Sequence, residues 1–106
     1  MNHTHIPDMT SLQDTPEKGI LSRTIQNDEN VKIVLFGFAA GEELSEHTAS
    51  MPAIMHFLSG QADVTLGAEA IVATEGTWVH MDAGLKHSIK ANSPVKMLLT
   101  LIKTGK

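Results

Sequence analysis

The chain has 106 residues, of which 42% are hydrophobic and 19% charged, with a formal net charge of -4 and no cysteine. This length corresponds to one domain able to bury a core, and a chain without cysteine forms neither disulfides nor thiolate metal sites. The negative charge is unlike that of nucleic-acid-binding proteins, and no apolar run could span a bilayer, so we expect no nucleic-acid partner and no membrane partner.

Residues 1–19 are polar, contain two prolines and lack the basic and apolar regions of a secretory signal. We therefore expect an N-terminal arm over 1–19, followed by a barrel domain over 20–106, in a cytoplasmic protein. About eight short strands are predicted, over 20–26, 31–38, 53–58, 62–66, 70–73, 77–81, 86–91 and 95–102. We expect segment 39–45 to be a turn and loop. With no helical pattern, this spacing predicts an all-β sandwich or barrel.

The predicted strands over 31–38 and 95–102 are apolar on both faces. In the first, Ile33 and Leu35 have one parity, and Val34 and Phe36 have the other. An antiparallel sheet with one solvated face should alternate instead, so both faces must be covered, by a second sheet or by another subunit. Because a small barrel encloses only one face of its sheet, we expect a homodimer.

Two glycine-framed segments each carry a histidine. The first frame holds Gly41, His47 and Gly60, and the second holds Gly76, Asp82, Gly84 and His87. Glycine adopts turn conformations that other residues avoid, and neutral imidazole is both a common metal ligand and a general base. In the second frame, Ser88 and Lys90 share the polar face of a strand, which turns His87 inward. We therefore expect His47 and His87 to face one cavity.

The paired frames resemble the two motifs of the cupin superfamily, small RmlC-like jelly-roll barrels. The resemblance covers roughly 31–102 and implies an antiparallel double-stranded β-helix. It also implies that His47 and His87 stand at two of the four usual metal-ligand positions. Ala49 and Ala53 stand at the positions where cupins carry a second histidine and a glutamate. Asp82 takes the place of the second motif's proline.

A metal site therefore needs a third ligand, because catalytic zinc uses three protein ligands and non-haem iron two histidines and a carboxylate. The candidates are His80, Glu43, Glu46, His56 and Asp82, with the thioethers of Met51, Met55 and Met81 as soft alternatives. His80 shares a strand face with Trp78 and is expected inward, so the candidate metal ligands are His47, His87 and His80. His56 has the wrong parity. We expect a divalent metal, Zn, Ni or Fe, to be held only weakly.

Three other features have a structural and a functional interpretation. Trp78 is expected to line the pocket or to plug one end of the barrel. Acidic residues near His47, such as Glu42, could orient its ring through a hydrogen bond or could be loop charges. His3 and His5 form an H-x-H pair in the arm, which we expect to be solvated.

The leading functional hypothesis is a module that binds a small molecule in the barrel cavity beside an incomplete metal site. One alternative is a metal-dependent enzyme of oxygenase or isomerase type. The other is metal-free acid–base catalysis by His47 or His87. These patterns leave open whether the protein is an enzyme.

Overall fold

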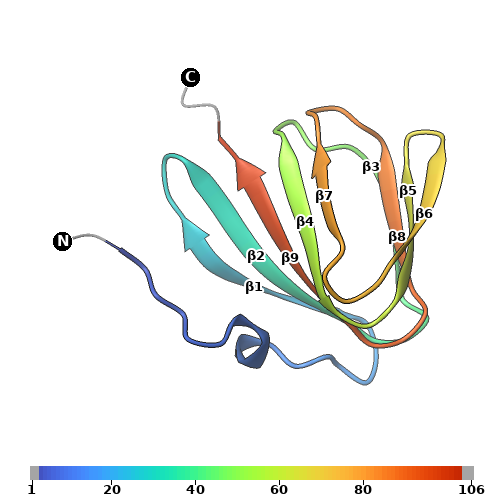
Figure 1. Ribbon diagram of the computed structural model, residues 1–106, viewed down its shortest axis with the longest axis horizontal. Coiled ribbons are helices and arrows are strands. Elements are labelled where there is room, and N and C mark those ends of the chain that lie inside the picture. Colours follow the sequence, from blue (N-terminus) through green and yellow to red (C-terminus); the bar gives the residue numbers. More distant parts are fainter. Residues whose placement is uncertain (1–2, 104–106) are drawn as a thin grey trace.

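Figure 1 shows a computed structural model of the chain, in which residues 3–103 are described. Within them, one short 3-10 helix, η1 (Met9–Leu12), precedes nine strands. The strands are β1 (Ile20–Asn27), β2 (Val31–Phe38), β3 (Glu43–His47), β4 (Ala53–Ser59), β5 (Ala62–Leu66), β6 (Glu69–Ala73), β7 (Trp78–Met81), β8 (His87–Ala91) and β9 (Val95–Ile102). None of the helical structure in residues 3–103 is long and apolar enough to cross a membrane.

The strands form two antiparallel sheets that face each other (Figure 1). One sheet has five strands in the order β1-β2-β9-β4-β7, and the other has four in the order β3-β8-β5-β6. The chain crosses between the sheets after β2, β3, β4, β6, β7 and β8. Two antiparallel sheets wound together in this way form a jelly roll, so the predicted all-β fold class is confirmed.

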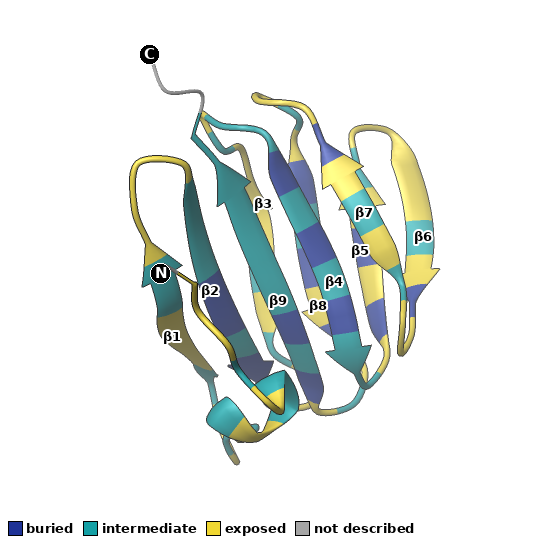
Figure 2. Cartoon of the chain, turned by 60° about the vertical axis from the view of Figure 1, so that its left-hand side comes forward, coloured by how far each residue is buried: buried dark blue, intermediate teal, exposed yellow. Residues whose placement is uncertain are grey.

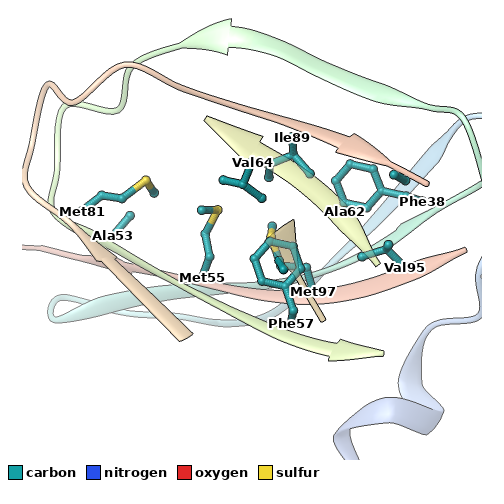
Figure 3. Packing of buried hydrophobic residues seen from close by; sticks show 12 residues of the cluster. Phe38, Ala53, Met55, Phe57, Ala62, Val64, Met81, Ile89, Val95 and Met97 are labelled. Carbon is teal, nitrogen blue, oxygen red and sulfur yellow. The ribbon is translucent and has the colours of Figure 1, made fainter. Parts of the chain in front are cut away.

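The core lies between the sheets, where their inward-facing side chains meet (Figure 3). In β4, Ala53, Met55 and Phe57 are buried while the residues between them are half-exposed. In β8, Ile89 and Ala91 are likewise buried, while Ser88 and Lys90, which alternate with them, are more exposed. A large apolar side chain contributes about 1.5–3 kcal/mol when it leaves water in this way. The two-residue period of each strand thus determines which side chains reach the interior.

The N-terminal arm packs on the outer face of the five-stranded sheet, as Figure 2 shows for η1 over β2 and β9. Lys96 donates from Nζ to the Thr10 carbonyl oxygen at 2.6 Å, and Arg23 donates to the Leu12 carbonyl oxygen at 2.9 Å. A Cβ at Gly37 would stand 2.5 Å from the main-chain oxygen of Asp14, so only glycine allows this approach. Part of the outer apolar face is therefore covered by the chain itself.

The frame glycines have the left-handed backbone that the sequence predicted, with φ of 87° at Gly41, 86° at Gly60, 94° at Gly76 and 86° at Gly84. Gly60 has a second constraint, because a Cβ there would lie 2.1 Å from the Pro94 carbonyl oxygen. The turn between β4 and β5 therefore requires glycine for both backbone angle and space.

The prediction of a loop over 39–45 was wrong in its second half, because β3 begins at Glu43. Leu44 is the one large apolar residue of this strand, and the others are exposed. A polar edge strand carries little periodic signal. Pairing with β8, from Glu43 opposite Lys90 to His47 opposite His87, holds it in the sheet.

Candidate functional site

His47 and His87 lie directly opposite each other on the neighbouring strands β3 and β8. Their ring centroids are 4.2 Å apart and the ring planes are tilted by 58°. His87 is only 5% exposed and shares its strand face with the core residues Ile89 and Ala91. His47 is exposed. The structure therefore brings the two frame histidines together, one inside the barrel and one at its edge.

A β-bulge in β3 places His47 on the inner face. Leu44 pairs with Ile89 and His47 pairs with His87, so β3 uses one residue more than β8 over this interval. Without the extra residue, simple alternation from Leu44 would turn His47 outward. The bulge at Ser45 and Glu46 is thus the local feature that creates the pair.

Each ring is oriented by the main chain two residues earlier. His47 Nδ1 lies 2.8 Å from the Ser45 carbonyl oxygen, and His87 Nδ1 lies 2.9 Å from the Leu85 carbonyl oxygen. A carbonyl oxygen only accepts hydrogen bonds, so Nδ1 must carry the hydrogen in both rings. In the neutral rings, Nε2 is then the nitrogen with the free lone pair. Both histidines therefore offer Nε2 to a ligand or a metal.

The opposite wall of the barrel is formed by a row of paired residues across the five-stranded sheet. The row consists of Lys32 on β2, Leu101 on β9, Ala53 on β4 and Met81 on β7. Ala53 and Met81 are buried and lie together at one end of the core (Figure 3). Because directly paired residues project to the same face, Leu101 and Lys32 also belong to the inner face.

The histidine pair lies at the same end of the barrel as this row. Loop 48–52 leads from His47 to Ala53, and loop 82–86 leads from Met81 to His87. A hydrogen bond of 2.9 Å from the Gly84 N–H to the Ala49 carbonyl oxygen joins the two loops.

Lys32 is an inner-face residue that sequence reasoning missed. It is half-buried and has the same parity as the inward-facing Val34 and Phe36 of β2. That parity was visible in the sequence, but both faces of β2 are apolar, and only the pairing with Leu101 shows which face is the inner one.

The expectation that His80 points inward was wrong. On β7, Met81 is buried and Val79 half-buried, while His80 and Trp78 are exposed. Trp78, 58% exposed, neither lines the interior nor plugs the barrel. Its cross-strand partner is His56, which faces outward as expected from its parity.

The acidic candidates also lie elsewhere. Glu43 pairs with Lys90, whose side chain is exposed, and Glu46 and Asp82 are exposed. Across residues 3–103, no group of three or more histidine, cysteine, aspartate or glutamate side chains could hold a metal ion. With Ala49 and Ala53 at the two remaining positions implied by the cupin resemblance, the side chains of this site do not by themselves fit a resident divalent cation. His3 and His5 are exposed in the arm.

Comparison with known proteins extends these observations to a family. The family model described as "Cupin domain" matches residues 34–102. The matched range contains both histidines and three residues of the opposite row, Leu101, Ala53 and Met81, whereas Lys32 lies just before it. No curated protein matches the chain.

Solved structures resemble the chain over nearly its whole length. A conserved Streptococcus pyogenes protein of unknown function is 29% identical, with a TM-score of 0.83 over 97% of this chain and 90% of that one. A cupin superfamily protein from Desulfitobacterium hafniense is 26% identical, with a TM-score of 0.84 over 96% and 93% of the two chains. KdgF from Halomonas is 17% identical, with a TM-score of 0.77 over 80% and 81%; at that identity the likeness shows the fold alone.

Proposed function

This chain belongs to the cupin family, and we propose that it binds a small molecule in the barrel interior at the His47–His87 pair. The observation that carries the proposal is the shared orientation of the two rings. Each ring is fixed through Nδ1 to a main-chain carbonyl, which leaves both Nε2 lone pairs free to accept. Fixed polar groups beside an apolar wall are typical of small-molecule sites.

The residues around the histidine pair indicate which chemical class of ligand would bind there. Leu66, the other cross-strand partner of His87, and Leu101, Ala53 and Met81 on the opposite wall offer only apolar contacts. Neutral imidazole nitrogens accept hydrogen bonds from hydroxyl or carboxylic acid groups. Lys32 adds a positive charge to the inner face. These features favour a small molecule with an apolar frame that carries a hydroxyl or acidic group.

Metal binding by the protein alone is expected to be weak. Two neutral imidazoles provide fewer donors than a divalent ion uses in a catalytic site and bring no negative charge to offset its own. A metal-dependent oxygenase or isomerase would need a further ligand from the protein, and His80 does not supply it because its side chain lies on the outer face.

The proposal is tested by nuclear magnetic resonance of the histidine ring nitrogens in protein treated with a chelator. A library of small alcohols, phenols and carboxylic acids is added, and binders are expected to shift the Nε2 signals of His47 and His87. The His87→Ala and His47→Ala variants should lose these binders. His56→Ala, which alters an outward-facing histidine of β4, is the matched control and should keep them. Binders that persist in both site variants would contradict the proposal.

A further inference from the structure

We propose that the outer patch, the part of the five-stranded sheet's outer face that the N-terminal arm leaves uncovered, is a self-association surface for a second copy of the chain. In this assembly the Trp78 indole of each copy donates a hydrogen bond to an imidazole of the other. The outer patch consists of Ile54, His56, Trp78, His80, Leu98 and Thr100. It lies on the outside of the barrel, away from the His47–His87 pair, so the inference goes beyond the proposed function and does not depend on it.

Strand pairing places these six side chains together. The first row of the outer patch holds Leu98 on β9, His56 on β4 and Trp78 on β7, which are directly paired across the sheet. The second row lies two residues further along each strand and holds the other three members. Directly paired residues project to the same face, and so do residues two apart on one strand. The outer patch is therefore a continuous block on three neighbouring strands.

The outer patch is left to solvent in a single copy. Figure 2 shows the arm and η1 over β1, β2 and one end of β9, and no segment of residues 3–103 over β4 or β7 on this side. Trp78 is 58% exposed, His80 is exposed, and the other four members are half-buried. A tryptophan buries about 150–250 Å² when it is covered. Covering Trp78 therefore removes more apolar surface from water than covering any other side chain of the outer patch.

Charge points to a second copy as the occupant. The chain has a formal net charge of -4, so two copies repel each other unless they meet at neutral surfaces. The outer patch holds no aspartate, glutamate, lysine or arginine. Arg23 and Lys96, on the same face of the sheet, donate to carbonyl oxygens of the arm. By contrast, the outer face of the other sheet carries the paired row Glu43, Lys90 and Asp63. The outer patch thus has the depletion of charge that is typical of the centre of a protein interface.

The hydrogen-bonding groups of the outer patch match one another. An indole N–H only donates, and a neutral imidazole offers one ring nitrogen that accepts. In a two-fold dimer the same surface lies on both sides, so each contact between two different residues occurs twice. The donor is on Trp78, and the acceptors are on His56, its cross-strand partner, and on His80. A surface that meets itself can therefore pair its indoles with its imidazoles without groups from a different protein.

The unaltered protein is tested by sedimentation velocity and tryptophan fluorescence over the same range of concentrations. Because Trp78 is the only tryptophan, the emission reports on the outer patch alone. We expect a dimer whose emission maximum lies at shorter wavelength than that of Leu98→Glu, a variant that places a charge in the outer patch and keeps the indole in water. A monomer at every concentration, or a dimer with the same emission maximum as Leu98→Glu, would overturn the proposal.

A charge at Trp78 tests the surface directly. Trp78→Glu should shift the protein to monomer, because it removes the largest apolar side chain of the outer patch and brings like charges together in the dimer. The residue is exposed, so the core stays intact, and circular dichroism checks the fold. Val72→Glu adds the same charge at a position on the other sheet that is 57% exposed, and this matched control should remain a dimer. A dimer that survives Trp78→Glu, or that Val72→Glu disrupts equally, would contradict the proposal.

Trp78→Phe keeps an aromatic ring but removes the indole N–H, so it tests the hydrogen bonds separately. We expect the dissociation constant of the dimer to rise about tenfold, since two equivalent bonds are lost. Either His56→Phe or His80→Phe, whichever removes the acceptor, should give a similar rise, and combining it with Trp78→Phe should add little more. An unchanged dissociation constant in Trp78→Phe, or additive effects in both double variants, would overturn the indole–imidazole contact.

Discussion

The two site histidines use the same main-chain contact, from Nδ1 to the carbonyl oxygen of the residue two positions earlier. This contact fixes ring orientation and tautomer without a second side chain, so an acidic neighbour is not needed for that purpose. Glu42, which sequence reasoning considered for this role, instead accepts a hydrogen bond from the Gly19 N–H at 3.0 Å. The rings are therefore oriented by the main chain of the strand itself and not by neighbouring side chains.

Restoring the two absent ligand positions should convert the pair into a tight metal site. We expect the double variant Ala49→His and Ala53→Glu to bind Zn²⁺, Ni²⁺ or Fe²⁺ more tightly than the unaltered protein, because it adds two donors and one negative charge. Affinity should fall in acid, since protonated imidazole cannot bind metal. Titration calorimetry with each ion measures this change.

Ala53 is 1% exposed, so the folded state of the double variant is checked first by circular dichroism. Unchanged metal affinity in a folded double variant would show that these positions do not converge on the pair. Ala70→Glu, at an exposed position of β6, adds the same charge away from the site and serves as the control.

Asp28 gives a prediction about acid stability. The main-chain N–H of Asn30 lowers the pKa of its carboxyl below the ordinary value, with further hydrogen bonds from the Gln26 side chain and the Val31 N–H. A lowered folded-state pKa means that the ionised carboxylate stabilises the fold above the pKa of the unfolded chain. That stabilisation is lost as pH falls through the folded-state pKa.

We therefore expect Asp28→Asn to lower the free energy of unfolding at neutral pH and to lower it less in strong acid. Urea denaturation at a series of pH values from neutral to below the ordinary carboxyl pKa measures the difference. Asp63→Asn, at an exposed position of β5, is the control. A difference between Asp28→Asn and the unaltered protein that does not change with pH would contradict the assignment.

At the scale of elements, turns and apolar strands were predictable, whereas the histidine pair was only half predictable. The alternation of Ser88 and Lys90 with His87 correctly turned His87 inward. For His47 the same rule is insufficient, because the bulge in β3 shifts the parity after Leu44, and nothing in the polar segment 43–47 marks an inserted residue.

The prediction that His80 points inward was wrong for a related reason. On the short strand β7, one face carries Trp78 and His80 and the other carries Val79 and Met81. Both faces are plausible interior faces, because tryptophan is large and apolar. Only the pairing of Met81 with the buried Ala53 shows which face is enclosed. The two-residue period shows which residues share a face of the strand, and the packing of the sheets decides which of the two faces is buried.

The bulge leads to a prediction at this scale. Deleting Glu46 removes the extra residue of β3 and should turn His47 to the outer face, because a shift of one residue exchanges the faces of a strand. We expect the nuclear Overhauser contacts between the His47 and His87 rings to disappear while the rest of the barrel keeps its strand pairing. Glu46→Ala retains the residue count and should keep the contacts. Ring contacts that survive the deletion would contradict the role given to the bulge.

At the scale of the whole molecule, the outer face of the five-stranded sheet has one part that the arm covers and one part that is left uncovered. The arm covers the region of Gly37 and Lys96, near the fully buried Leu35. Beyond the arm, the half-exposed Ile54 and Leu98 and the exposed Trp78 continue the same face. The requirement that both faces of β2 and β9 be covered is thus met on the inside by the second sheet and on the outside in part by the arm.

We propose that a second copy covers the remainder, because large apolar side chains left exposed on a sheet are typical of an interface and two-fold dimers are the commonest closed assembly. Light scattering and analytical ultracentrifugation should therefore give a dimer. Leu98→Glu should shift the protein toward monomer, whereas Val72→Glu, at an exposed position on the other sheet, should not. A monomer at all concentrations would refute this expectation.

The hydrogen bond between Gly84 and Ala49 joins the two loops that carry the chain across the open end of the barrel. Because this bond connects main-chain atoms, it holds the loops together whatever side chains they bear. Widening that end would require breaking it and moving both crossings at once. For the binding function proposed above, the backbone would therefore limit the size of the ligand, while side-chain replacements at the histidine pair would alter which ligands of that size are retained.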